Sequence, residues 1–172
     1  MIADAAEPTR MKLGVVSDTH DNLDHVEAAV SHFESEGADV VVHCGDIVAP
    51  FSAAPFDADF DFHAVRGNND GEWALREAVE SFGTYHGDFA HLTLDGQEIA
   101  VYHGTEAGLV DALVESETYD FVLRGHTHER VVEHRGKTTH VNPGGLPIPG
   151  ADDEFHVAVV DLDTGNVASR SL

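Results

Sequence analysis

Residues 12–20 read KLGVVSDTH, an apolar and partly β-branched run that ends on polar residues, among them Asp18 and His20. Such a run is typical of a strand buried on both faces, and the polar residues mark the point where the chain must turn. By themselves, Asp18 and His20 would fit an ordinary turn. Four similar polar clusters follow other apolar runs, and this repetition predicts one site at the ends of several strands.

The chain has 172 residues, of which 42% are hydrophobic, enough for the core of one ordinary domain. We expect a flexible leader over residues 1–10 and a single domain over residues 11–172. No apolar run approaches the roughly 18 residues that span a bilayer, and the first ten residues lack the pattern of a signal peptide. Cys44 is the only cysteine, so no internal disulfide can form. We therefore expect a cytoplasmic protein that does not contact membranes.

Charge is the most unusual property of the composition, because 32 acidic residues against 9 basic residues give a formal net charge of -23. The acidic residues lie in segments with clear apolar periodicity, which favours a folded protein with an acidic surface over a disordered tail. Self-repulsion weakens at high salt, where the Debye length falls to about 3 Å near 1 M. We therefore predict a halophile-type surface. We expect no nucleic-acid-binding surface, because too few basic residues are present to form one.

The first half of the chain predicts a β-α-β-α-β order. After the first strand, apolar residues recur at helical spacing, with Asn22 as the expected helix cap and Gly37 as the expected end. Further strands are predicted over residues 39–43 and 62–65. A helix is predicted over residues 73–82, with Trp73 and Phe82 on its apolar face.

The second half reads mainly as hairpins, of which the clearest surrounds Asp95-Gly96. A helix over residues 109–116 and a strand over residues 121–123 separate this hairpin from two later ones. A parallel opening followed by antiparallel strands predicts an α/β protein with two mixed β-sheets packed face to face and flanked by helices.

Five polar clusters follow these predicted strands, and glycine recurs beside residue types that bind metals. Asp, Asn and His together supply oxygen and nitrogen ligands, which suit Mn, Fe, Co, Ni or Zn better than Ca. The clusters are Asp18-Thr19-His20, Gly45-Asp46, Gly67-Asn68-Asn69-Asp70, His103-Gly104 and Gly125-His126-Thr127-His128.

In order and spacing, the clusters resemble the motifs of the calcineurin-like metallophosphoesterases. The short chain, with Gly-Asn-x-Asp and Gly-His-Thr-His, is similar to the small bacterial and archaeal phosphodiesterase branch. The resemblance covers nearly the whole chain from Lys12 onward and implies an αββα sandwich with a binuclear metal site. In that site, Asp46 would bridge the two metals. The other implied ligands are Asp18, His20 and His128 for one metal, and Asn68, His103 and His126 for the second.

The resemblance also implies a hydrolase of small phosphoester substrates, with phosphodiesters favoured, in which a metal-bridging hydroxide attacks phosphorus in line. Two divalent ions about 3.5–4 Å apart can lower the pKa of a shared water and clamp both sides of such a displacement. Manganese is the first expectation, with Ni, Fe, Co and Zn as alternatives. The expected catalytic residues are Asp46, Asn68 and His103, with Asp70 nearby as an orienting acceptor.

Two positions depart from the family pattern. Asn69 stands where many relatives have a histidine that assists the leaving group, and an amide cannot act as a general acid near neutral pH. Gly145 replaces the serine of an Asn-Pro-Gly-Ser turn, and we assign the turn at residues 142–145 a structural role.

Two alternatives stay open: a phosphomonoesterase, and a metal-free interaction scaffold of the same fold. All seven implied ligand positions hold competent residues, which argues against the scaffold. The sequence does not determine the substrate, the native metal or whether the chain forms a homo-oligomer.

Residues outside the clusters receive structural interpretations. His43 and Cys44 are interpreted as packing groups rather than a redox pair, and Arg66 and Arg124 as partners of the abundant carboxylates. Several other histidines are predicted to lie on the surface: His25, His32, His86, His91, His134, His140 and His156.

Overall fold

The computed structural model describes residues 10–71 and 73–172. The predicted leader, residues 1–10, lies outside the described residues except for Arg10. In chain order the elements are β1 (Lys12–Val16), α1 (Leu23–Glu36), β2 (Val40–His43), α2 (Pro50–Ala53), the 3-10 helix η1 (Ala54–Phe56), β3 (Asp61–Ala64), α3 (Trp73–Glu80), β4 (Thr84–Tyr85), β5 (Phe89–Leu94), β6 (Gln97–Tyr102), α4 (Ala107–Glu115), β7 (Phe121–Leu123), β8 (Val131–Arg135), β9 (Thr138–Asn142), β10 (His156–Asp161) and β11 (Val167–Ser171).

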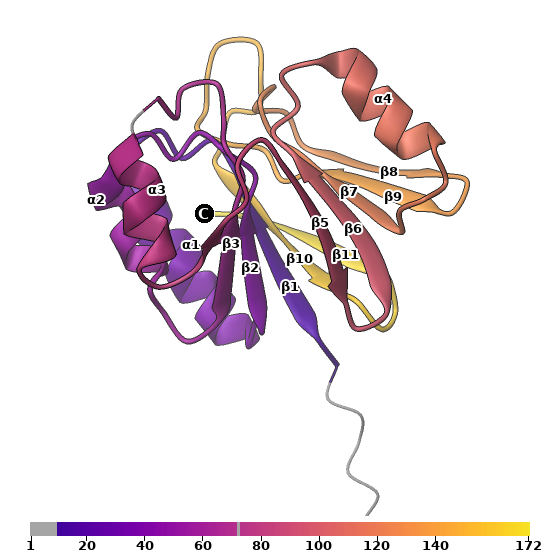
Figure 1. Ribbon diagram of the computed structural model, residues 1–172, viewed down its shortest axis with the longest axis horizontal. Coiled ribbons are helices and arrows are strands. Elements are labelled where there is room, and N and C mark those ends of the chain that lie inside the picture. The colour runs from indigo at the N-terminus through magenta and orange to yellow at the C-terminus, as the bar shows by residue number, and fades with distance from the viewer. Residues whose placement is uncertain (1–9, 72) are drawn as a thin grey trace, which may run out of the picture.

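Two mixed sheets form the centre of the molecule. The first has the order β11-β10-β1-β2-β3-β4, and the second has the order β5-β6-β7-β9-β8. In the first sheet, β1 pairs in parallel with β2 and antiparallel with β10. Helices α1, α2 and α3 lie on the outer side of the first sheet, and α4 lies outside the second (Figure 1). The predicted α/β sandwich of two mixed sheets is confirmed.

Alternation along the strands explains why both faces of the first sheet are apolar. On β1, Leu13 and Val15 pack in the cluster between the two sheets, whereas Val16 packs in the cluster beneath the helices. Gly14 lies where a Cβ atom would come within 2.7 Å of the Phe33 ring on α1. The glycine therefore allows the helix to approach the strand closely.

Helix α1 begins and ends at the predicted residues. The Asn22 side chain accepts a hydrogen bond from the backbone N–H of His25 at 3.1 Å. Gly37 ends the helix in the left-handed conformation, with φ of 68°, which glycine adopts without steric cost. The buried face consists of Val26, Ala29, Val30 and Phe33.

Several sequence interpretations are wrong in detail. Trp73 is 75% exposed and does not belong to the apolar face of α3. Phe82 packs against the core, but it lies beyond the end of α3 at Glu80 rather than on the helix. His140 and His156 are buried rather than on the surface, since both lie on strands covered by neighbouring elements. Strand β4 was not predicted, because two residues are too few to show the alternation typical of a strand.

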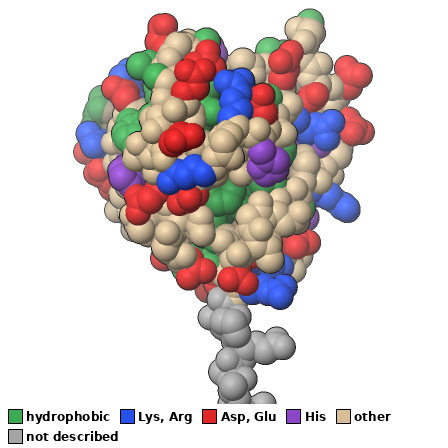
Figure 2. All heavy atoms as spheres, turned by 90° about the vertical axis from the view of Figure 1, so that its right-hand side faces the viewer, with side chains coloured by type: hydrophobic (Ala, Val, Ile, Leu, Met, Phe, Trp, Pro, Cys, Tyr) green, Lys and Arg blue, Asp and Glu red, His purple; other side chains and the backbone are tan. Residues whose placement is uncertain are grey.

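The described surface carries acidic side chains across the face seen in Figure 2, with lysine and arginine side chains between them. Within the described ranges, no helix combines the length and apolar character needed to cross a membrane.

Candidate metal centre

The five polar clusters meet at one edge of the sandwich, because they follow strands that run in the same direction within each sheet. Strands β1, β2 and β3 pair in parallel in the first sheet, and β6 pairs in parallel with β7 in the second. The carboxyl ends of parallel strands meet at one edge, which is where open α/β sheets place their binding sites. Both sheets therefore contribute side chains to one centre.

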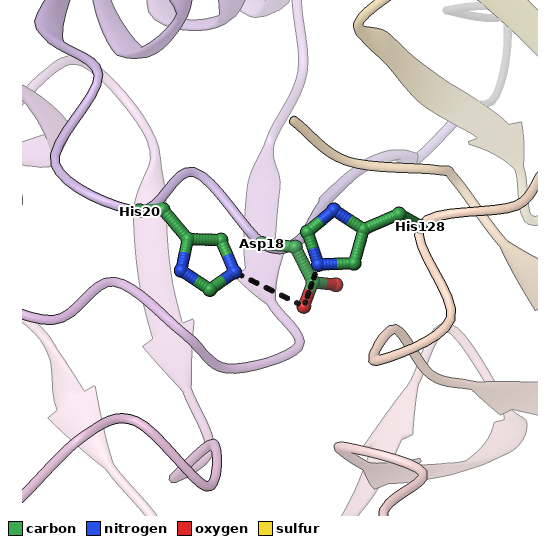
Figure 3. A group of neighbouring side chains, drawn as sticks. All are labelled: Asp18, His20 and His128. Atoms are coloured by element: carbon green, nitrogen blue, oxygen red, sulfur yellow. Dashed lines mark ion pairs between the residues drawn. The ribbon is translucent and has the colours of Figure 1, made fainter. Parts of the chain in front are cut away.

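The first group of side chains comes from the loop after β1 and the loop after β7. Asp18 Oδ1 lies 3.5 Å from His128 Nε2 and 3.8 Å from His20 Nε2. Figure 3 shows the two imidazole rings directed at the same carboxylate oxygen. All three ligand atoms lie within 4.8 Å of one another, close enough to bind one ion.

The second group extends the centre toward β3 and β6. Asp46 Oδ2 lies 3.4 Å from His20 Nε2 and 3.4 Å from His103 Nε2, so this carboxylate stands between the two groups. Asn68 Oδ1 lies 3.0 Å from His103 Nε2 and 3.0 Å from His126 Nδ1. The structure thus brings all seven predicted ligand residues into one cluster.

Two buried atoms of this cluster have no hydrogen-bond partner among the described residues: Asp18 Oδ1 and His20 Nε2. The other oxygen, Asp18 Oδ2, accepts from Ser17 Oγ at 2.6 Å and from the backbone N–H of His126 at 2.9 Å. Leaving a buried carboxylate oxygen unpaired is costly. A divalent cation fits this arrangement, because it would satisfy both atoms at once.

Backbone carbonyls determine which nitrogen two of the histidines present. His103 Nδ1 donates to the carbonyl oxygen of Cys44 at 2.8 Å, and His128 Nδ1 donates to that of Leu146 at 2.6 Å. A carbonyl can only accept, so Nδ1 carries the proton and the lone pair lies on Nε2. This outer hydrogen bond is typical of metal-binding histidines.

The electrostatic environment keeps the two central carboxylates ionised. Burial disfavours the charged form of Asp46, but hydrogen bonds from His103 and Asn69 outweigh it and hold the pKa of Asp46 well below its usual range. For Asp18, burial is likewise outweighed by His20, His103 and Ser17, and the pKa is lowered. Both groups are therefore available as anionic ligands at neutral pH.

Backbone strain is concentrated at the centre. Asp18, His20, Asp46, His126 and His128 all have positive φ, between 43° and 72°. Residues other than glycine seldom adopt this conformation, and strain of this kind is held in place by the surrounding structure at functional sites. The backbone thus aims these side chains at the centre at a cost in local stability.

Three residues support the centre without joining the cluster of ligand atoms. Asn69 donates from its backbone N–H to Asp46 Oδ1 and from its side chain to Asp46 Oδ2, both at 2.8 Å. Asp70 accepts from the backbone N–H groups of Asp46 (2.9 Å), Val48 (2.7 Å) and Gly67 (2.8 Å). The carboxylate of Asp70 therefore holds two loops together.

His43 is the third supporting residue, and sequence reasoning missed its role. It is fully buried, its Nδ1 accepts from the backbone N–H of Gly45 at 3.2 Å, and its Nε2 lies 3.1 Å from Thr19 Oγ1. Burial lowers the pKa of His43 to about 3. The neutral ring thereby joins the loops after β1 and β2. A histidine on the last residue of a strand is too common a pattern to have indicated this.

The structure changes the interpretation of Arg124 and agrees with that of Cys44. The Arg124 side chain donates to Thr127 Oγ1 and to the carbonyl of Gly125, rather than to a carboxylate. It therefore braces the loop that contains His126 and His128. Burial raises the pKa of the Cys44 thiol, so this group stays protonated and inert, as its interpretation as a packing group requires.

Comparison with known proteins agrees with the fold. The model of the calcineurin-like phosphoesterase superfamily domain matches residues 11–165. Phosphodiesterase MJ0936 of Methanocaldococcus jannaschii is 36% identical over 154 residues, which cover 83% of this chain and 93% of that protein. Phosphodiesterase YfcE of Escherichia coli is 29% identical over 171 residues, covering 91% of each protein.

A solved structure of an archaeal phosphodiesterase superposes with a TM-score of 0.88 at 31% identity, covering 94% of this chain and all of that one. Because the family model and this relative each span most of the sequence, the chain belongs to the calcineurin-like phosphoesterase superfamily.

Proposed function

We propose that this protein is a binuclear metal-dependent phosphodiesterase that hydrolyses small phosphodiesters. Membership of the superfamily makes it a metal-dependent phosphoester hydrolase. The observation that carries the binuclear proposal is the position of Asp46 Oδ2, at 3.4 Å from the ligand nitrogens of both His20 and His103. One carboxylate oxygen that faces both groups is suited to bridge two cations.

In this proposal, Asp18, His20 and His128 hold one divalent ion, and Asn68, His103 and His126 hold the other. When bound, the ions supply Lewis acidity, which lowers the pKa of water, offsets charge at phosphorus and underlies the in-line displacement predicted from the sequence. They also reverse the local sign of the potential, which an anionic substrate needs in a protein with a net charge of -23.

The chain's own residues position and polarise these groups. His103 and His128 present Nε2 because Nδ1 is held by backbone carbonyls. Asn69 fixes the orientation of Asp46. Asp70 contributes as a positioning residue rather than through contact with substrate, since both of its oxygens accept backbone hydrogen bonds.

The preference for diesters and for manganese is supported by different observations. Relatives that match most of the chain are named phosphodiesterases. A donor set of carboxylate, amide and imidazole groups suits manganese, with Ni, Fe, Co and Zn as competing ions. No histidine follows Asn68 to protonate a poor leaving group, which favours diesters with good leaving groups.

The test is hydrolysis of bis(4-nitrophenyl) phosphate and of 4-nitrophenyl phosphate by metal-depleted protein before and after addition of Mn. We expect activity only with metal, and faster turnover of the diester. Activity that persists after complete chelation would overturn the proposal, and faster monoester turnover would replace it with a phosphomonoesterase.

The substitution Asp46→Asn tests the bridging role. We expect turnover to fall by more than about 100-fold, because substitution of residues that only orient ligands already costs about 10- to 100-fold. We also expect a lower metal content per chain. Asp57→Asn, at an exposed carboxylate directly after η1, is the matched control and should behave like the wild type. Wild-type turnover with wild-type metal content in Asp46→Asn would contradict the model of the site.

A further inference from the structure

A cavity of about 380 Å³ opens directly beside the proposed second metal. Asn68 belongs both to the ligand cluster and to the cavity wall, so a phosphoryl group held at the centre would have one ester substituent facing this space. The rest of the wall comes from the loops after β3, β4 and β6, from the end of β6 and from α4. The lining residues are Arg66, Gly67, Asn68, Asp88, Tyr102, Thr105 and Leu109.

The wall combines a cation with apolar surface. Tyr102 is half-buried, with its hydroxyl group accepting from the backbone N–H of Glu106 at 3.1 Å. Leu109 is 54% exposed, so much of its apolar surface is open to a ligand in the cavity. Both side chains are available to cover a flat apolar group.

Arg66 is the only cation of this wall, and its guanidinium group is incompletely paired. Its Nε donates to the carbonyl of Asp70 at 3.0 Å, which orients the planar group. The nearest carboxylate, of Asp88, lies 3.9 Å away and its side chain is 81% exposed. Such an exposed contact contributes little, so the guanidinium keeps donors and a planar face for a ligand.

A second cavity of about 230 Å³ lies beneath α4 and is lined by Arg124 and Arg135. Unlike Arg66, these two arginines are already paired. Arg124 is engaged by Thr127 and Gly125, and Arg135 contacts Asp111 and Glu133 at 3.4 and 3.1 Å. Those guanidinium groups already serve structural contacts. The cavity at Arg66 is therefore the better candidate for a ligand.

We propose that the cavity at Arg66 is a subsite for an aromatic ester substituent of the phosphodiester substrate. The ring would lie against Tyr102 and Leu109 and stack with the guanidinium plane of Arg66. This inference rests on the proposed function, since the phosphoryl group must sit at the metal centre. It identifies the substrate class as phosphodiesters with at least one ring substituent, as opposed to small alkyl diesters.

The experiment compares binding of diphenyl phosphate and dimethyl phosphate to the Mn-loaded protein by calorimetry. Both carry one negative charge, so their difference reports the ring. We expect the wild type to bind diphenyl phosphate about tenfold more tightly, because only a ring fills the cavity. Leu109→Ala should reduce this ratio about threefold or more.

The substitutions Arg66→Gln and Arg66→Lys distinguish the contribution of the planar guanidinium group to ring binding from that of its positive charge. If the ring stacks on the guanidinium, both substitutions should lower the ratio about threefold, since lysine keeps the charge without the plane. The exposed Arg170→Gln and Val132→Ala are matched controls outside the cavity and should leave the ratio unchanged. Equal affinity for the two diesters, or an unchanged ratio in all three cavity variants, would overturn the inference.

Hydrolysis of bis(4-nitrophenyl) phosphate by the same preparations separates failure of the subsite from failure of the proposed function. Metal-dependent turnover without any ring preference would remove the subsite and leave the phosphodiesterase. Ring-selective binding without any turnover would support the subsite and remove the proposed activity.

Discussion

Asn69 supports Asp46 through both its backbone and its side chain. It donates to both oxygens of Asp46 at 2.8 Å, once through the backbone and once through the amide. By its resemblance to the family, this position is the place of an absent histidine. In the structure, the Asn69 amide instead donates a hydrogen bond to Asp46, the carboxylate proposed to bridge the metals.

Replacing Asn69 by alanine removes the side-chain hydrogen bond and leaves the backbone one. We expect metal affinity and kcat to fall about 10- to 100-fold, the loss typical of groups that orient a metal ligand. Metal titration by calorimetry and diester kinetics measure the two effects. Asn166→Ala, in an exposed turn, is the matched control. Unchanged affinity and turnover in Asn69→Ala would show that Asp46 needs no such support.

Gly67 shows how closely the loops approach one another. A Cβ atom at this position would lie 2.1 Å from Asp46 Oδ1 and 2.2 Å from the Asp46 backbone nitrogen. A backbone nitrogen cannot move aside as a flexible side chain can. We therefore expect Gly67→Ala to displace Asp46, to destabilise the fold by roughly 1–3 kcal/mol and to reduce metal binding.

Gly71 provides the control for this substitution, because it lies four residues later and, its chain neighbours aside, no atom of the described residues lies within 4 Å of its added Cβ. Gly71→Ala should keep the stability and metal content of the wild type. Thermal unfolding and metal analysis of both variants check the prediction. Equal behaviour of the two variants would mean that the loop adapts to the added methyl group.

At the scale of elements, strand β2 connects the core to the centre through its last residue. Val40 and Val42 pack between the sheets, Val41 packs beneath the helices, and His43 lies under the loop that carries Asp46. Because His43 is fully buried and its pKa falls from 6.5 to about 3, folding requires the neutral ring.

This requirement predicts a pH dependence of stability. Below pH 6.5 the unfolded chain binds a proton at His43 that the folded chain does not, so the stabilisation is complete above pH 6.5 and declines as pH falls toward 3. The decline approaches about 1.4 kcal/mol per pH unit. Between pH 7 and 5, the stability difference between wild type and His43→Gln should shrink by about 2 kcal/mol.

Urea unfolding of the metal-depleted proteins at the two pH values measures this difference without a contribution from metal binding. His134→Gln, on an exposed part of β8, serves as the control. A difference between wild type and His43→Gln that does not change with pH would show that the buried ring is protonated without cost.

At the scale of the whole molecule, the two sheets contribute to one centre while the surface carries a net charge of -23. Mutual repulsion of surface carboxylates opposes the compact state, and salt screens it. We predict that the folded state requires high salt. Circular dichroism and thermal unfolding in about 2 M and about 50 mM KCl measure this effect, since the Debye length changes severalfold between them.

Loss of secondary structure or a large drop in the unfolding temperature at low salt would support the halophile-type surface. A spectrum and an unfolding temperature that do not change between the two conditions would remove that inference.

The sequence alone predicted every strand of the two sheets other than β4. It also predicted the residues that cap and end α1. Period-2 and helical spacing are local properties, so they can be read from neighbouring residues. The exposed position of Trp73 and the buried positions of His140 and His156 could not be read in this way. They depend on which element covers a given face, which is a property of tertiary packing.

For the proposed centre, the sequence by itself determined which residue types follow each strand and in what order. Only the tertiary structure decided their distances, the nitrogen that His103 and His128 present, the support of Asp46 by Asn69, and the cavity beside Asn68. The physical reason is that the carboxyl ends of strands far apart in the sequence meet only after the sheets have formed. Asp18 and His128 are ordinary turn residues until that edge brings them within 3.5 Å.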